Sequence, residues 1–454
     1  MNGVIYPLFV VLCIIAAVLQ QKTSRTNLEL AARSNPDFVN FQRRFFVVYF
    51  AALFSDWLQG PYVYRLYATY GFESGTIAIL YIIGFAASAL FGTFTGPLAD
   101  RFGRKRLCLL FCLLYSICCL TKLSANFYML AFGRILGGIS TSILFSSFES
   151  WYIYEHVQHY DFPQEWIMGT FSKTTFWNGF LAIMAGIAAN ATAEWMNFGP
   201  VGPFLLAIPI LALCAVLILK NWDENQGNEK GEFSRQCMGG LNRILQEEKI
   251  LLLGFVQSIF ESVMYIFVFL WTPTLDVYST LLPLGIIFSC FMVCIMIGSS
   301  LYELIVSTGK YTSEHTLTWC LIMSGVSMFI SFIFAKETEE NTMLFIIPLV
   351  GFLILEVAVG MYYPGIGFLR SQEVPEAYRA AIMNWFRVPL NVITCGGLLW
   401  LQGDKSHKIR SVYFACVVLC LIGLLAKQKF SALRRQAGII ASSPSKQNIL
   451  PTDD

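Results

Sequence analysis

Charge is what this chain of 454 residues has least of, and the scarcity narrows the class of protein. Asp, Glu, Lys and Arg together make up 13% of the sequence, against roughly 25% in soluble domains. Neither sign dominates, because 31 basic side chains stand against 29 acidic ones, for a formal net charge of +2. A nucleic-acid-binding protein presents a strongly basic surface, so this balance argues against that class.

The sequence also lacks the short motifs of most enzymes. It has no CxxC pair, no phosphate-binding loop and no Ser-His-Asp set. Among its four histidines, His156 and His159 lie beside Glu155 and Asp161, a spacing that could bind a metal weakly, although a solvated loop is the simpler interpretation. We therefore expect no enzyme, no cofactor and no metal site.

Apolar residues are abundant, at 56% of the chain, and they fall into long runs. A membrane-spanning helix needs about 20 such residues, and windows of that length give thirteen candidate spans. The candidates cover approximately residues 3–20, 45–65, 75–97, 107–123, 128–148, 168–190, 202–219, 250–272, 283–302, 316–335, 343–363, 381–401 and 411–427.

The arrangement of these spans predicts an all-α membrane protein with internal duplication. The first span stands apart, because a polar linker follows it, and the other twelve divide six and six around a segment rich in charge, Asn and Gly. We expect a leading helix and linker, a first six-helix bundle, a central loop, a second six-helix bundle and a tail, at residues 1–43, 44–219, 220–249, 250–429 and 430–454.

A turn between two of the spans carries the strongest motif. Residues 96–106 read GPLADRFGRKR, which resembles the G-x-L-a-D-r-x-G-R-k loop signature of the major facilitator superfamily. The resemblance implies the major facilitator fold, with this turn in the cytoplasm and Gly96, Asp100, Gly103 and Arg104 acting in gating. An acid stabilises a helix N-terminus, so we expect Asp100 near the helix that begins around Ala380, holding one face closed.

Basic residues give the orientation. With the signature turn in the cytoplasm, the connecting segments on that side hold most of the Lys and Arg, as the positive-inside rule requires. The C-terminus is then cytoplasmic and the N-terminus lies outside. A cleaved signal peptide is the alternative for residues 3–20, but the basic start of a signal peptide is missing. The sequon at Asn190 falls on the outer side, at the end of a helix.

Six charged residues lie within the expected spans, where each is a functional candidate because burying a charge in a membrane is costly. Three are basic and three acidic, so an internal network of structural ion pairs is the alternative to a functional role. They are Arg134, Lys173, Arg387, Asp56, Glu261 and Glu356.

The two halves repeat some of these features at matching positions. Asp56 follows Phe54-Ser55 in the first core helix, and Glu261 follows Phe260 in the seventh; Asn178 follows Phe176-Trp177 in the fifth, and Asn384 precedes Trp385-Phe386-Arg387 in the eleventh. Transporters built from repeats bind substrate between the repeats near the membrane midplane. We therefore expect Asp56 and Glu261 to face a central cavity.

Arg134 has a motif of its own. The string Arg134-Ile135-Leu136-Gly137-Gly138 resembles the R-x-x-x-G motif of the superfamily, in which a buried arginine faces the central cavity. The glycines beside it allow close approach of a neighbouring helix.

Four further strings resemble the animal molybdate-anion transporters, a branch of the superfamily that shares the extra leading helix. They are residues 55–62 (SDWLQGPY), 148–152 (FESWY), 260–262 (FES) with 270–273 (LWTP), and 384–389 (NWFRVP). The resemblance implies a plasma-membrane carrier of molybdate. It transfers no binding role to individual residues.

The residue types suit such a substrate. A tetrahedral dianion offers only acceptor oxygens, and the donors available in the spans are Arg134, Lys173, Arg387, Asn178, Asn384 and Tyr62. Importing a dianion against a 100 mV potential costs roughly 4.6 kcal/mol, so uptake needs coupling, most simply to protons carried by the three intramembrane acids. A carrier of sugars or neutral metabolites, with Trp57, Trp177, Trp271 and Trp385 stacking on rings, and a non-transporting nutrient-responsive scaffold remain alternatives.

Overall fold

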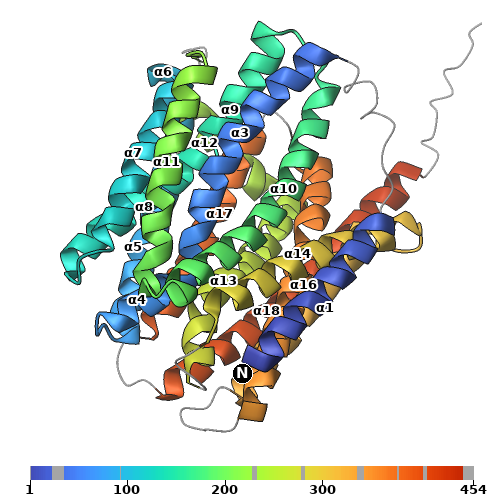
Figure 1. The fold of residues 1–454 in the computed structure, drawn as a ribbon. Coiled ribbons are helices and arrows are strands. Elements are labelled where there is room, and N and C mark those ends of the chain that lie inside the picture. Colours follow the sequence, from blue (N-terminus) through green and yellow to red (C-terminus); the bar gives the residue numbers. More distant parts are fainter. Residues whose placement is uncertain are drawn as a thin grey trace, which may run out of the picture.

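The computed structural model describes residues 2–22, 35–92, 94–226, 233–277, 282–334, 342–375, 378–401 and 406–442. Within these ranges every regular element is a helix (Figure 1). The leading helix is α1 (Asn2–Lys22). The N-terminal half then comprises α3 (Pro36–Gln59), η1 (Gly60–Tyr62), α4 (Val63–Thr69), α5 (Ser74–Gly92), α6 (Thr95–Phe102), α7 (Arg104–Thr121), α8 (Phe127–Leu144), α9 (Ser147–Tyr154), η2 (Glu155–His159), α10 (Glu165–Asn190), η3 (Ala191–Trp195), η4 (Gly199–Val201) and α11 (Gly202–Asn221).

The C-terminal half repeats the pattern of long helices. It comprises α12 (Phe233–Gln246), α13 (Glu248–Asp276), α14 (Leu284–Ser307), α15 (Ser313–Phe334), α16 (Thr342–Glu373), α17 (Arg379–Leu399) and α18 (Ser406–Ser442).

Ten helices of the described part are long and apolar enough to cross a membrane. Of the thirteen expected spans, the three that do not meet this criterion correspond to α3, α7 and α17. Their sequences explain this, because α3 carries Arg43 and Arg44, α7 opens on Arg104-Lys105-Arg106, and α17 contains Arg387. The assignment of these three as spans stays a prediction.

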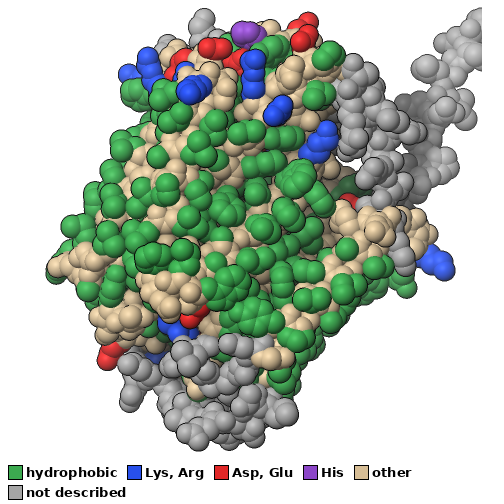
Figure 2. All heavy atoms as spheres, in the orientation of Figure 1, with side chains coloured by type: hydrophobic (Ala, Val, Ile, Leu, Met, Phe, Trp, Pro, Cys, Tyr) green, Lys and Arg blue, Asp and Glu red, His purple; other side chains and the backbone are tan. Residues whose placement is uncertain are grey.

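The surface is consistent with a membrane protein. Figure 2 shows hydrophobic side chains over the middle of the visible face, while Lys, Arg, Asp and Glu gather toward the end that carries α6 and the start of α3. An apolar band of this kind is stable only against lipid, since soluble proteins rarely expose such large apolar patches.

The two halves meet along two helix pairs, α10 with α14 and α5 with α17. In the first pair the backbones touch, because a Cβ added at Gly186 would lie 2.6 Å from the carbonyl oxygen of Gly285, and one at Gly285 would lie 2.3 Å from that of Gly186. Small residues at a crossing let membrane helices approach closely and gain van der Waals contact.

The leading helix α1 packs on the outside of α14 (Figure 1). Ser300 Oγ donates a hydrogen bond to Gln20 Oε1 at 3.0 Å, and Cys13 lies near Cys290, so α1 and α14 run parallel. The N-terminus consequently lies at the end of the molecule opposite the signature turn.

Two expected segment boundaries are wrong. The linker expected up to residue 43 is helical from Pro36, because Asn35 Oδ1 accepts from the backbone amides of Asp37 and Phe38 at 3.0 and 3.1 Å and so caps α3. The expected central loop contains α12, whose Ile244 is buried against the C-terminal half. Helix α12 was not predicted because it is too short and too polar to span a membrane.

The crossing of α14 and α16 provides a stability test. A Cβ at Gly360 would lie 2.1 Å from the carbonyl oxygen of Ile295, whereas one at Gly396 would meet nothing within 4 Å. We expect Gly360→Ala to destabilise the protein by about 1–3 kcal/mol through overpacking. Gly396→Ala should be neutral or slightly stabilising, because Ala favours a helix over Gly. Melting temperatures of the two variants purified in detergent compare them, and equal values would contradict the close approach.

Candidate functional site

Each of two intramembrane acids is hydrogen-bonded to a tyrosine of its own half. Tyr115 of α7 donates to Asp56 Oδ1, and Tyr362 of α16 donates to Glu261 Oε1 at 3.1 Å. A neutral donor satisfies a carboxylate and leaves its charge uncompensated. The expectation that Asp56 and Glu261 face a central cavity stays a prediction.

Glu356 is the most enclosed of the three acids. It lies on α16, only 5% exposed, and it faces Cys294 of α14. Among the described residues, none forms a hydrogen bond or an ion pair with its carboxylate. A carboxyl group in such a place is stable only when it is neutral or when a partner arrives.

Arg134 lies between α8 and α5. Its Nε donates to the carbonyl oxygen of Leu80 at 3.1 Å, and its guanidinium lies 5.0 Å from the ring centroid of Tyr81. Gly84 makes room for it, since a Cβ there would lie 2.5 Å from Nη2. The guanidinium is thus held in a half-buried place by a carbonyl and an aromatic face.

Arg387 lies on α17, where the halves meet. A Cβ at Gly92, the last residue of α5, would lie 3.6 Å from its Nη1. The charge of Arg387 acts on Glu261 and Tyr265 of α13, and the charge of Arg370 on α16 acts on Glu261 as well. Sequence reasoning missed Arg370, because the expected span ended at residue 363.

The other predicted donors are spread along the molecule. Asn178 Oδ1 accepts from Trp57 Nε1 at 2.8 Å, and Trp57 reaches Phe288 of α14 with ring centroids 6.0 Å apart, so this pair lies at the seam between the halves. Asn384 is half-buried on α17, one turn before Arg387. Lys173 Nζ donates to Gln42 Oε1 at 3.1 Å, toward the start of α3 and the end with the signature turn.

Tyr62 belongs to the opposite end. Its ring is fully buried, and its hydroxyl lies 3.3 Å from Asn190 Oδ1 and 3.4 Å from Glu194 Oε1. Asn190 is fully buried too. The sequon asparagine therefore cannot be reached by a glycosylating enzyme in this conformation.

The signature turn is fixed by residues that follow α11. Gly103 has φ +100°, and a Cβ there would lie 2.5 Å from Glu224 Oε1. The Glu224 carboxylate accepts from the backbone amides of Lys105 and Arg106 at 3.0 and 3.2 Å, which places a negative charge at the N-terminus of α7. Arg104 lies over the ring of Tyr154, 5.1 Å from its centroid. Sequence reasoning missed Glu224.

The two other expected gating residues lie in the short helix before the turn. Gly96 and Asp100 belong to α6, and the surroundings of the Asp100 carboxylate lie outside the described residues. The expected contact of Asp100 with the start of α17 stays a prediction.

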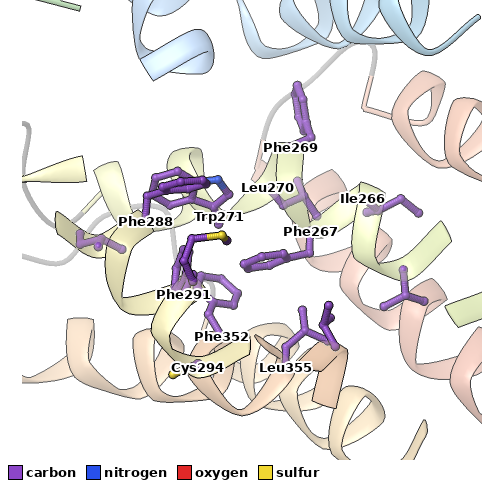
Figure 3. Close-up of a cluster of buried hydrophobic side chains, with 14 of the residues drawn as sticks. Ile266, Phe267, Phe269, Leu270, Trp271, Phe288, Phe291, Cys294, Phe352 and Leu355 are labelled. Atoms are coloured by element: carbon purple, nitrogen blue, oxygen red, sulfur yellow. The ribbon is translucent and has the colours of Figure 1, made fainter. Parts of the chain in front are cut away.

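The end opposite the signature turn is closed by contacts between the halves. Arg65 of α4 forms an ion pair with Asp276 of α13, with Nε 3.0 Å from Oδ2. Phe269 of α13 packs edge-on against Tyr64 and Tyr81, with centroids 5.3 and 5.1 Å apart. In Figure 3, Phe269 points away from the buried cluster of α13, α14 and α16, toward the N-terminal half.

At the end with the signature turn, each ion pair between described residues lies within one half, such as Arg106 with Glu224 in the N-terminal half and the following two in the C-terminal half. Lys249 pairs with Glu373 at 3.5 Å, and Arg434 pairs with Glu314 at 2.6 Å. These pairs stabilise one half without tying it to the other, whereas the pair of Arg65 with Asp276 joins the two halves.

The polar stretch at His156 is not a solvated loop. His156 is fully buried, with Nε2 2.9 Å from the carbonyl oxygen of Pro163 and Nδ1 3.2 Å from the Tyr152 hydroxyl. The rings of Phe38 and Phe162 lie against it. The described part of the chain holds no group of three or more His, Cys, Asp or Glu placed to bind a metal ion.

Comparison with known proteins identifies the family. A family model described as sugar transporters with 12 transmembrane segments matches residues 4–351. A protein named molybdate-anion transporter from Xenopus tropicalis is 46% identical over 406 residues, 88% of each chain. One of the same name from Danio rerio is 41% identical over 459 residues, 93% of this chain and 94% of its own.

Solved structures agree on the fold. The nucleoside transporter NupG superposes with a TM-score of 0.66 at 12% identity, covering 86% of this chain and 99% of its own. A likeness at this identity concerns architecture alone, because one fold hosts many substrates. The chain belongs to the molybdate-anion transporter family of the major facilitator superfamily, and its family and fold are those of membrane transporters, not enzymes.

Proposed function

We propose that this protein imports molybdate across the plasma membrane by alternating access, coupled to an ion. The observation that carries the proposal is the identity of 41–46%, over about nine tenths of the chain, with relatives named for molybdate. The unpaired carboxyl of Glu356 and the arginines within the helix bundle support a charged substrate, because buried charges in membrane proteins mark ion pathways.

The substrate site in this proposal lies between Arg134 and Arg387, one from each half. Asn178 and Asn384 add amide donors at the seam, and both arginines can offer two N–H groups to a tetrahedral anion. Lys173, which contacts the start of α3, and Tyr62, which is enclosed at the opposite end, bind the anion only as it enters or leaves.

Glu261 is the proposed coupling residue closest to the substrate. The charge of Arg387 acts on its carboxylate, so an ionised Glu261 competes with the anion for that arginine. Protonation of Glu261 removes the competitor and releases Arg387 for molybdate. Asp56 and Glu356 are the further candidates, since importing a dianion against 100 mV costs roughly 4.6 kcal/mol and needs more than one proton.

The way in which the halves are joined supports alternating access. Residues 44–219 and 250–429 move as two units about the contacts of α10 with α14 and α5 with α17. The conformation described is closed at the Arg65 end. With the signature turn and the C-terminus in the cytoplasm, this conformation faces inward.

A sugar carrier is the second candidate, because the matching family model is described by sugar transport. Exposed Phe176 and Trp177 on α10 could stack on a sugar ring. A neutral sugar has no need of Arg134 and Arg387. Uptake of molybdate, sulfate and hexoses by proteoliposomes containing the purified protein separates the candidates, and absence of all uptake would favour a non-transporting scaffold.

The arginines give the first test of function. We expect Arg134→Gln and Arg387→Gln each to weaken molybdate binding by about 2–5 kcal/mol, at least a 30-fold rise in KM, because the dianion loses a charge-assisted partner. Arg410→Gln is the matched control, since Arg410 lies on α18 over the ring of Phe332. Radiolabelled uptake is measured after membrane insertion has been verified. Wild-type uptake in both site variants would make these arginines structural.

Coupling is tested at Glu261. Wild-type uptake should rise when the outside is made acidic, because protonation releases Arg387. In Glu261→Gln, uptake driven by a pH gradient should lose this pH dependence. Exchange of labelled for unlabelled molybdate should continue. Glu248→Gln, which alters a surface acid paired with Lys429, is the control. A full pH response in Glu261→Gln would remove this residue from the coupling scheme.

Gating is tested at the signature turn. Asp100→Asn should lower the rate of uptake and leave surface expression intact, because the cytoplasmic face closes less well. Glu224→Gln removes the charge at the start of α7 and one of the two oxygens that accept from backbone amides there, so it separates stability of the turn from the role of Asp100. Unchanged transport in Asp100→Asn refutes the gating role.

A further inference from the structure

The ion pair between Arg65 and Asp276 joins residues 211 positions apart, one from each half. The contact is two-pronged, with Nε donating to Oδ2 and Nη2 donating to Oδ1. The side chains are 16% and 21% exposed, so the pair is shielded from bulk water on most sides. Such a pair is stronger than one at an open surface, where solvent and salt screen it.

An aromatic layer separates this pair from the deeper arginine. Tyr64, next to Arg65 in the chain, packs against Phe269, and the opposite contact of Phe269 is Tyr81. The ring of Tyr81 in turn carries the guanidinium of Arg134. Arg65 and Arg134 thus lie on the two sides of one aromatic layer. Phe269, from the C-terminal half, occupies the middle of that layer.

We propose that Arg65 is the outer anion-binding residue of the transporter and that Asp276 holds the place of the anion while this end is closed. The inference rests on the proposed transport of an oxyanion. When α4 and α13 separate, Arg65 stays with the N-terminal half and its two donor groups face the opening. Molybdate presents two oxygens to the same fork that binds the carboxylate in the closed state.

This arrangement links the binding of an anion at Arg65 to the closing of the two halves at this end. An anion bound to Arg65 blocks the return of Asp276, so the halves close only after the anion has moved past the Phe269 layer toward Arg134. A further acid at this end, Glu194, lies near the hydroxyl of Tyr62 on the N-terminal half, and it repels an anion that binds away from Arg65. A cation at the opening also raises the rate of anion capture, an effect that salt weakens.

The test uses two variants that remove the same ion pair from opposite sides. Arg65→Gln should raise the KM for molybdate at least tenfold, because the binding group is lost. Asp276→Asn should leave KM unchanged or lower it, because the competitor is lost and Arg65 remains. Arg65→Lys, which keeps the charge but not the fork, should give an intermediate KM and guards against misfolding of the Gln variant.

Initial rates of radiolabelled uptake into proteoliposomes are measured at several molybdate concentrations and at two salt concentrations. The salt dependence of KM should be smaller in Arg65→Gln than in the wild type or in Asp276→Asn. Equal effects of Arg65→Gln and Asp276→Asn would show a closing contact only and overturn the proposal. Absence of saturable molybdate uptake by the wild type would instead refute the proposed function, and this inference with it.

Discussion

The cost of placing charge in a medium of low dielectric is the constraint on which the rest of this structure depends. A membrane protein can bury an ionisable group only if protein groups replace the water it loses. Here neutral partners do much of that work: tyrosine hydroxyls contact Asp56 and Glu261, a backbone carbonyl and a ring contact Arg134, and an amide contacts Lys173. A neutral partner satisfies hydrogen-bonding capacity without cancelling the charge of the group that it contacts.

The contrast with Arg65 and Asp276 shows what full pairing does. Two opposite charges in contact cancel each other, so neither attracts another ion until the pair separates. The protein pairs Arg65 with Asp276 where the halves meet, and it places Asp56, Glu261 and Arg134 against neutral hydrogen-bonding groups in the interior. Charged side chains of the same types thus serve either to hold the halves together or to bind an ion. The partner of each charged group decides which of the two roles it has.

Long apolar runs and glycine-rich turns were readable from the sequence, because they depend on local composition. Ten of the expected spans coincide with helices of the described part that are long and apolar enough to cross a membrane, and Gly103 in the signature turn has a positive φ. Asn35-Pro36 is also a typical start of a helix, with a capping residue followed by proline. A prediction based on apolar runs does not include it. The amphipathic helix α12 was missed for the same reason.

The partners of charged residues could not be read in this way. Tyr115 and Tyr362 lie 59 and 101 positions from the acids that they contact, and helical periodicity says nothing about which of twenty tyrosines will do so. Arg65 and Asp276 lie at the ends of apolar runs, where charges are ordinary. Only the packing of the halves gives them a common role.

The leading helix has a consequence for how small this transporter can be. Helix α1 covers the face of α14 that contains Ser300 and Cys290, and its first turn also reaches the other half, where Trp195 Nε1 lies 3.4 Å from the Tyr6 hydroxyl. Without α1, Ser300 would lose its partner and that face of α14 would meet acyl chains. The described helices other than α1 would therefore leave one side of α14 uncovered, and the extra helix takes the place of lipid along that side.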